Sequence, residues 1–411
     1  MNALDVLYIP VAALTSPWWA RKARGGWKQR LGHTPTLPPV THPGGRVLLH
    51  AVSVGEVSAL RELVPLLINR CEVVVATTTD TGLSRATDLF GKLCPVVRYP
   101  LDFSKSVRRF LDAVQPTAVG LVELEVWPNF IRECARREIP VGVINGRLSA
   151  RSFKGYRKIR PVLRRTFATL AFAGVQDQDY FERFEAMGVP RERLSITGTM
   201  KWDAAKIQSE VPGAAELATE LGIDRGVPLI VAGSTGPGEE ALLHAACPDG
   251  VQLLCAPRKP ERFDEATAAM PGAVRRTLTK GKPVTPGAKR FVLDTIGELR
   301  RAYALADVVV VGRSFFDQFG SDPIEPAALG KAVVIGPAVS DFANIVAAFE
   351  QAGGIVKVHR GELAATLRGL IGDAERRRRL AAAAVECVRQ NQGASTRSAD
   401  LLLAKSSRAK L

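Results

Sequence analysis

Residues 46–63 read RVLLHAVSVGEVSALREL, and this stretch decides the fold class. An apolar run at 47–49 is followed by a turn of small residues that holds Gly55, and apolar residues at helical spacing follow from Leu60. This order predicts a strand, a tight loop and a helix. In open α/β sheets, ligands bind outside the carboxyl ends of the strands. Glu56 therefore lies where a carboxylate can take a proton from an incoming nucleophile.

A structural interpretation of the same residues remains open. Ser53 and Glu56 have the spacing of a capping box, in which the two side chains satisfy backbone donors at a helix start and do no chemistry. Taken alone, the segment favours this cap over a catalytic Glu56.

Length and residue usage limit the class of protein. A chain of 411 residues is too long for one ordinary domain, so we expect two. The six cysteines and five histidines are scattered without metal-type spacing, which predicts neither a metal site nor a metal cofactor. Free cysteines of this kind fit a reducing cytoplasm.

Strand and helix patterns alternate along the whole chain, which predicts parallel sheets with crossover helices. A stretch rich in glycine and proline at 210–227 is the predicted linker. We therefore expect an N-terminal segment (1–30), a first Rossmann-like domain (31–208) and a second one (209–411), with the two sheets facing across a cleft. The predicted strands are 47–51, 73–77, 96–99, 118–122, 141–144 and 171–175, then 229–232, 251–255, 308–311, 333–335 and 355–358.

The net charge of +15 predicts an anionic partner such as nucleic acid, a membrane surface or a phosphorylated substrate. Nucleic-acid motifs are absent from the sequence, so no nucleic-acid partner is expected. Residues 3–20 are apolar but carry Asp5 and two prolines, and they include a pair of tryptophans near their end, after which a basic cluster follows. This pattern is typical of a segment lying in a membrane interface. An ordinary first helix packed on its own domain is the alternative.

Two acidic residues, Glu123 and Glu125, follow the strand at 118–122. A pair of carboxylates at a strand end can do acid/base work, although one of them can simply cap the helix that begins near Pro128. Arg147 closes the next strand, and Lys201 lies in a later loop where it could meet an anionic substrate or only water.

The second half carries features suited to phosphate. AGSTGPGEE at 232–240 is a glycine-rich turn after a strand, and its backbone donors predict an anion site or, equally, a capped helix. Three cations, Arg258, Lys259 and Arg262, follow the next strand and favour a phosphate contact. Glu325 opens a further helix, where it could bind ribose hydroxyls or complement the helix dipole.

Taken together, the order of the motifs resembles that of the 3-deoxy-D-manno-octulosonic acid (Kdo) transferases, a family with the GT-B glycosyltransferase fold. The resemblance spans nearly the whole chain. The matching segments are GWKQRLG (26–32), HAVSVGE (50–56), ELEVWPN (123–129), NGR (145–147), GTMKWD (198–203), PRKPERF (257–263), IGEL (296–299) and EPAALGK (325–331).

This resemblance implies an inverting, metal-independent transfer of Kdo from CMP-Kdo to the lipid A precursor lipid IVA, at the cytoplasmic face of the bacterial inner membrane. The protein would be peripheral or monotopic there, on an anionic membrane surface. Glu56 matches the general base. The implied acceptor or cleft residues are Ser53, Gly55, Glu123, Glu125, Arg147 and Lys201. The implied donor residues are Ser234, Arg258, Lys259, Ile296, Gly297, Glu298, Leu299, Asp322 and Glu325.

One departure from the family pattern lies at residues 319–322, which read FGSD where the family usually has Gly-Gly-His-Asn. An extra negative charge at Asp322, beside a phosphate or the Kdo carboxylate, would cost roughly 1 kcal/mol or more at a partly exposed site. Arg313 could neutralise it. We expect a tolerated variant. A GT-B transferase that uses a UDP-sugar on a membrane lipid, and a weakened lipid-binding homologue, remain the alternatives.

Overall fold

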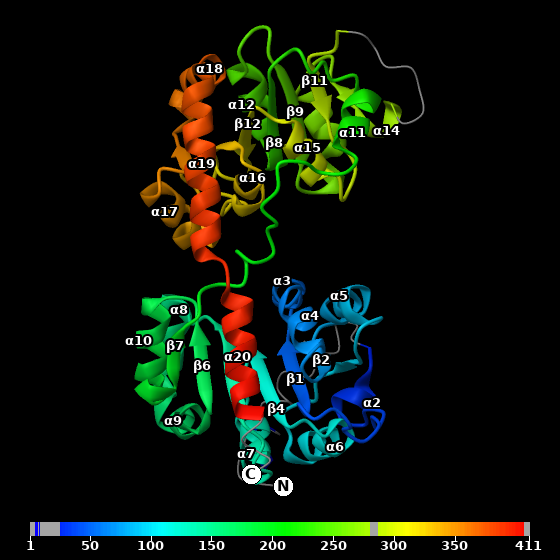
Figure 1. Cartoon of the computed structure of the whole chain (residues 1–411), viewed down its shortest axis with the longest axis vertical. Coiled ribbons are helices and arrows are strands. Elements are labelled where there is room, and N and C mark those ends of the chain that lie inside the picture. The colour runs from blue at the N-terminus through cyan, green and yellow to red at the C-terminus, as the bar shows by residue number, and fades with distance from the viewer. Residues whose placement is uncertain (1–4, 7, 9–24, 280–286, 407–411) are drawn as a thin grey trace. The chain divides into compact units, whose positions relative to one another are not determined.

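The computed structural model describes residues 5, 6, 8, 25–279 and 287–406. It divides into two compact α/β units, shown in Figure 1. Unit 1 consists of Met1–Ala204 together with Gln392–Leu411, and unit 2 of Ala205–Asn391. Each unit is built on one sheet of seven parallel strands, as the alternation of strand and helix patterns predicts.

The sheet of unit 1 has the order β3-β2-β1-β4-β5-β6-β7. Its strands are β1 (Arg46–Ala51), β2 (Glu72–Thr77), β3 (Val96–Arg98), β4 (Ala118–Val122), β5 (Val141–Gly146), β6 (Phe172–Val175) and β7 (Leu194–Ile196). Its helices are α2 (Trp27–Arg30), α3 (Val54–Ala59), α4 (Leu63–Ile68), α5 (Asp80–Phe90), α6 (Ser104–Val114), α7 (Pro128–Arg136), α8 (Ala150–Lys158), α9 (Arg160–Thr169), α10 (Gln178–Met187) and α20 (Ala394–Ser406), with a 3-10 turn η1 (Arg191–Arg193).

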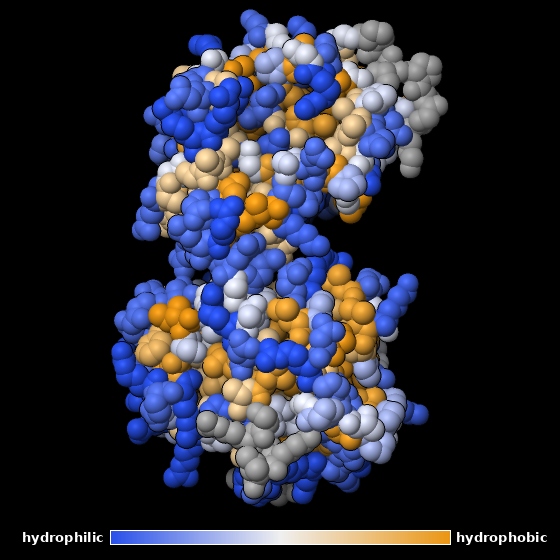
Figure 2. Space-filling view, in the orientation of Figure 1, coloured by the Kyte–Doolittle hydropathy of each residue, from blue (hydrophilic) through white to orange (hydrophobic). Residues whose placement is uncertain are grey.

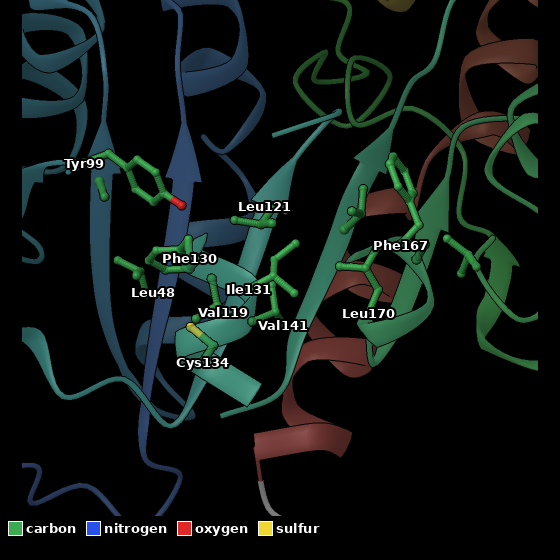
Figure 3. Packing of buried hydrophobic residues seen from close by; sticks show 14 of the residues in the cluster. Leu48, Tyr99, Val119, Leu121, Phe130, Ile131, Cys134, Val141, Phe167 and Leu170 are labelled. Atoms are coloured by element: carbon green, nitrogen blue, oxygen red, sulfur yellow. The ribbon is translucent and has the colours of Figure 1, made fainter. Parts of the chain in front are cut away.

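Both faces of this sheet are covered, which explains why β1 is apolar throughout. Val47 and Leu49 face a core shared with α3, α4, α5 and α20. Leu48 faces the opposite core, which α6, α7, α9 and α10 line with phenylalanines. Figure 3 shows part of that second core, where Tyr99 lies near Leu48 and Phe130 beside the strands.

The sheet of unit 2 has the order β10-β11-β9-β8-β12-β13-β14. Its strands are β8 (Leu229–Thr235), β9 (Gln252–Pro257), β10 (Val274–Arg275), β11 (Arg290–Val292), β12 (Val308–Val311), β13 (Ala332–Ile335) and β14 (Ile355–Lys357). Its helices are α11 (Ala214–Leu221), α12 (Glu239–Ala246), α13 (Phe263–Ala268), α14 (Arg276–Thr279), α15 (Leu299–Leu305), α16 (Ile324–Ala328), α17 (Ala343–Gln351), α18 (Leu363–Gly372) and α19 (Ala374–Asn391), with 3-10 turns η2 (Pro260–Arg262), η3 (Ser340–Phe342) and η4 (Arg360–Glu362).

The division of the chain differs from the sequence prediction at both ends of the second domain. It falls between Ala204 and Ala205 rather than after residue 208, and residues 392–411 belong to unit 1. The chain returns because α20 buries Leu402 against the first sheet. In addition, the Asp203 carboxylate accepts hydrogen bonds from the backbone N–H of Gly393 and of Ser395.

The prediction of a linker at 210–227 was wrong, because this stretch contains α11. The helix lies between two glycines with left-handed backbone, Gly213 and Gly222. Its apolar face, with Leu217 and Leu221, is buried in unit 2. Glycine marks the ends of a helix here rather than an extended connection.

Most of the proposed membrane-interface segment at 1–30 lies outside the described residues. Asp5 and Tyr8 are described, and both contact unit 1. Asp5 accepts a hydrogen bond of 2.9 Å from the backbone N–H of Ser104, and the Tyr8 hydroxyl donates to Asp102 at 3.0 Å. Within the described part of the chain, the structure has no helix that is both long enough and apolar enough to cross a bilayer.

Candidate active site

The strand order of each sheet identifies where a ligand site belongs. In unit 1 the chain reverses its direction of winding between β1 and β4, and in unit 2 between β8 and β12. The loops at the carboxyl ends of such strand pairs diverge, and ligands of open α/β sheets bind between them. The segments HAVSVGE and ELEVWPN, which contain predicted site residues, lie at the first of these points. The segment AGSTGPGEE lies at the second.

Ser53 and Glu56 form a cap that also fixes the carboxylate in place. The Ser53 Oγ accepts a hydrogen bond of 3.4 Å from the Glu56 backbone N–H and is the N-cap of α3. The Glu56 carboxylate accepts from the Val52 N–H and from the Ser53 hydroxyl, both at 2.8 Å. Since the side chain remains half-buried, the cap interpretation and the catalytic one are compatible.

Glu123 joins Glu56 in a cluster of charges within unit 1. Burial raises the pKa of Glu123, and the negative charge of Glu56 raises it further, while Arg147 and Lys201 act in the opposite sense. These interactions place Glu56, Arg147 and Lys201 in the neighbourhood of Glu123. The structure thus brings together residues that the sequence placed after three different strands and in a later loop.

Glu125 is the third carboxylate of this cluster. Burial raises the pKa of Glu125 to about 7, although the Trp127 Nε1–H donates to it at 2.8 Å, and the charges of Glu56 and Glu123 add to the increase. Glu125 thus holds its proton more tightly than an exposed glutamate does, and a substantial fraction of the molecules carry it in neutral form near pH 7.

His50 is a site residue for which sequence reasoning named no role. It is fully buried at the end of β1, and burial lowers its pKa to about 3, so the ring is neutral. The His50 Nδ1 lies 3.2 Å from the Ala76 carbonyl, which can only accept, so Nδ1 carries the hydrogen. The bare Nε2 then faces a Glu125 oxygen at 3.8 Å. The sequence feature that could have identified His50 is a single histidine inside an apolar strand.

The glycine-rich turn after β8 is closed by a carboxylate of its own. Glu239 is fully buried, and it accepts hydrogen bonds from the backbone N–H of Gly236 at 2.9 Å and of Ser314 at 2.8 Å. The N–H groups of Arg313 and Phe315 donate to it as well. Glu239 therefore joins the loops after β8 and β12, and the donors it occupies are not available to a phosphate.

The three cations after β9 have different roles. Arg262 is buried and makes two hydrogen bonds of 2.9 Å to the Glu240 carboxylate, so it is part of the core of unit 2. Arg258 and Lys259 are exposed. The Arg258 backbone N–H donates to the Thr235 carbonyl at 3.0 Å, which places Arg258 beside the end of β8, where Ser234 lies.

The segment 296–299 leads into α15. Ile296 is 74 % exposed and Gly297 has a φ of 91°, which favours glycine. Burial would raise the pKa of Glu298, but hydrogen bonds from Thr295 and Arg276 outweigh this effect and hold it below the usual value. The Glu298 carboxylate thus stabilises the loop, and Leu299 is the first helical residue.

Asp322 and Glu325 lie at the start of α16. The Asp322 Oδ1 accepts a hydrogen bond of 2.9 Å from the Ile324 N–H, and Glu325 lies 3.4 Å from an Arg300 nitrogen. Arg313, suggested by the sequence as a counter-charge for Asp322, donates to the Gln318 carbonyl at 2.8 Å. Two hollows that share Asp317, Pro337 and Ala338 adjoin this region.

Tyr303 lies close to β8 and also interacts electrostatically with these two acidic residues. Its ring is buried, and its hydroxyl lies so close to Gly233 that a Cβ there would come within 1.9 Å of it. Burial raises the pKa of Tyr303, followed by the charges of Glu325 and Asp322. Tyr303 therefore lies near both the end of β8 and the start of α16. The described residues include no group of three or more His, Cys, Asp or Glu that could hold a metal ion.

Comparison with known proteins identifies relatives of this chain. A family profile described as 3-deoxy-D-manno-octulosonic-acid transferase matches residues 25–204. The 3-deoxy-D-manno-octulosonic acid transferase of Haemophilus influenzae is 32 % identical over 88 % of this chain and 87 % of its own length. The enzyme of the same name from Bordetella pertussis is 31 % identical over 93 % of each chain.

Among solved structures, HepE of Anabaena in complex with UDP superposes with a TM-score of 0.60 and 15 % sequence identity. The match covers 86 % of this chain and 96 % of that one. At this level of identity the similarity concerns the fold, which is the GT-B arrangement of two Rossmann-like domains.

Proposed function

Since the chain belongs to the Kdo transferase family, we propose that its donor is CMP-Kdo and that its acceptor is the lipid A precursor lipid IVA. It is a glycosyltransferase that transfers Kdo in lipopolysaccharide core biosynthesis. The observation that most supports a catalytic site in unit 1 is the Glu56 carboxylate, held by Val52 and Ser53 at the end of β1.

In the proposed reaction Glu56 is the general base. It takes the proton of the acceptor hydroxyl as that oxygen attacks the anomeric carbon of Kdo. The bond between that carbon and the phosphate oxygen breaks, and its electron pair leaves with CMP. The proton ends on Glu56, and attack opposite the leaving group inverts the configuration. Because CMP is a weakly basic phosphate monoester, it needs charge stabilisation rather than a strong acid.

The donor side is assigned to unit 2. Arg258 and Lys259, exposed after β9, would neutralise the phosphate, together with Ser234 at the end of β8. The loop at 296–299 would contact the nucleotide. Glu325, with Asp322 beside it, would bind the ribose hydroxyls, which are hydrogen-bond donors suited to carboxylates. Glu239 and Arg262 are excluded from ligand contact by their own buried partners.

We also assign the protein to the cytoplasmic face of the bacterial inner membrane, as a peripheral or monotopic enzyme on an anionic lipid surface. A lipid acceptor resides in a membrane, and the net charge of +15 suits an anionic one. The role of the N-terminal segment at 1–30 in this association remains a proposal.

The test is to incubate purified protein with CMP-Kdo and lipid IVA and to follow CMP release and product mass. For Glu56→Gln we expect kcat to fall roughly 100-fold or more, as is typical for loss of a general base. Glu62→Gln, a nearby glutamate outside the cluster, should keep the wild-type rate.

Two results would contradict the proposal. Transfer from a UDP-sugar, with no transfer from CMP-Kdo, would show that the proposed donor is wrong. This comparison is informative because Asp322 departs from the usual family pattern. If Glu56→Gln kept its rate and lost only stability, the role of Glu56 would be confined to the helix cap.

A further inference from the structure

The outer face of α8 and α9 is unusually rich in one sign of charge. Residues 150–169 carry seven cations and no Asp or Glu. None of the seven forms an ion pair with a carboxylate that the structure describes. The cations are Arg151, Lys154, Arg157, Lys158, Arg160, Arg164 and Arg165, and we call them, with Ile159 and Val162, the α8–α9 surface.

Two other arginine-containing helices of this protein, α10 and α19, combine charges of both signs. In α10, Arg183 lies 2.6 Å from an Asp179 oxygen. In α19, the arginine-rich run includes an ion pair of 3.2 Å between Arg379 and Glu375. A solvated helix face commonly mixes its charges in this way, whereas a face of one sign repels itself and needs an oppositely charged partner.

Exposed apolar side chains at the junction of the two helices also indicate a binding surface. Ile159 is 52 % exposed and Val162 is 62 % exposed, while Phe153 and Leu163 pack inward against the core of unit 1. In Figure 2 the part of unit 1 that holds α8 and α9 is largely hydrophilic, with a small hydrophobic patch near α8. Basic side chains around exposed aliphatic ones are typical of a helix that lies on a membrane interface.

The α8–α9 surface also adjoins the acceptor side of the candidate active site. The N-cap of α8 is Ser149, two residues after Arg147. On the same helix, burial raises the pKa of Tyr156, and the charge of Glu125 raises it further, so this side chain lies near the carboxylate cluster. Helix α8, which carries part of the α8–α9 surface, therefore also borders the candidate active site.

We propose that the α8–α9 surface docks on an anionic phospholipid bilayer and so presents the lipid acceptor to unit 1. The idea extends the proposed function, from which it takes the lipid acceptor, but bilayer binding can be measured without any transfer reaction. The α8–α9 surface would be a second membrane contact, in addition to the one proposed for the N-terminal segment.

The experiment compares binding of the full-length protein to phosphatidylcholine vesicles with and without phosphatidylglycerol, by co-sedimentation. We expect Arg157→Gln/Lys158→Gln to weaken binding to the anionic vesicles roughly thirty-fold, since each cation near such a surface contributes about 1 kcal/mol. Ile159→Ser/Val162→Ser should weaken it as well, and added salt should reduce the charge-dependent part.

The matched control is Arg376→Gln/Arg378→Gln, which removes two exposed arginines from α19 and should leave vesicle binding unchanged. Binding of the α8–α9 variants equal to that of the wild type would overturn the proposal, and so would an equal loss in the control. Binding of duplex RNA that depends on these residues, without binding to anionic vesicles, would overturn it too.

Transfer to a detergent-solubilised acceptor separates this proposal from the previous one. The α8–α9 variants should keep the wild-type kcat there, because no bilayer has to be bound. If the wild type binds vesicles through the α8–α9 surface but transfers nothing from CMP-Kdo, the proposed donor fails and the docking surface stands.

Discussion

Replacing Glu239 by Gln should loosen the loops that form the proposed donor side of unit 2. The Glu239 carboxylate accepts four backbone N–H groups, two on each oxygen. In Gln one oxygen becomes an NH₂ group, so two buried donors lose their acceptor. At about 1–3 kcal/mol for each unsatisfied donor, the loss is about 2–6 kcal/mol.

A second effect opposes this loss. Burial raises the pKa of Glu239, which shows that the site disfavours its charge, and Gln removes that charge. We therefore expect the lower half of the range, about 2–4 kcal/mol of unfolding free energy. The donor KM should also rise, because Ser234 and the loop after β12 lose their common anchor.

Hydrogen exchange measured by mass spectrometry on the full-length protein can localise the effect, since two units need not unfold together. Peptides covering 233–240 and 311–316 should exchange faster in the variant, while peptides covering 46–56 in unit 1 should not change. Glu216→Gln, on the exposed side of α11, is the control. A Glu239→Gln protein with exchange and melting equal to the control would refute the reasoning.

Three further predictions follow from the same contacts. Glu125 has its pKa raised to about 7 chiefly by burial, so the folded protein binds this proton more tightly than the unfolded one does, and the unfolding free energy should fall as the pH rises from about 4.5 to about 7. In urea titrations at several pH values, Glu125→Gln should lack this part of the pH dependence, and identical profiles would contradict it. Arg262→Ala should lower the unfolding free energy by about 3–5 kcal/mol because it leaves the Glu240 carboxylate buried without its partner. Pairing Arg262→Met with Glu240→Leu should restore most of the melting temperature, and no recovery would speak against the charge as the cause. Gly233→Ala should lower the melting temperature because its Cβ would lie 1.9–2.6 Å from the hydroxyl oxygen and two ring carbons of Tyr303. In a Tyr303→Leu background, which removes these three atoms, the same substitution should lower the melting temperature much less, and an equal loss in both backgrounds would not fit this contact.

The longer strands could be read from the sequence because their signal is local. β4 and β12 have the bounds that the apolar runs at 118–122 and 308–311 predict, since buried parallel strands are apolar on both faces. The strands β7, β10 and β11 were missed. Each has only two or three residues and so carries little local pattern, and their pairing depends on neighbours remote in the chain.

By itself, then, the sequence determined the parallel α/β class, the position of Glu56 at the end of β1 and the family. Only the tertiary structure decided which polar groups are free to meet a ligand. Arg258 and Arg262 look alike in PRKPERF, but Arg262 binds the buried Glu240. A strand reflects the order of residues along a few positions, whereas the partner of a charged side chain is set by residues that folding brings together from distant parts of the chain.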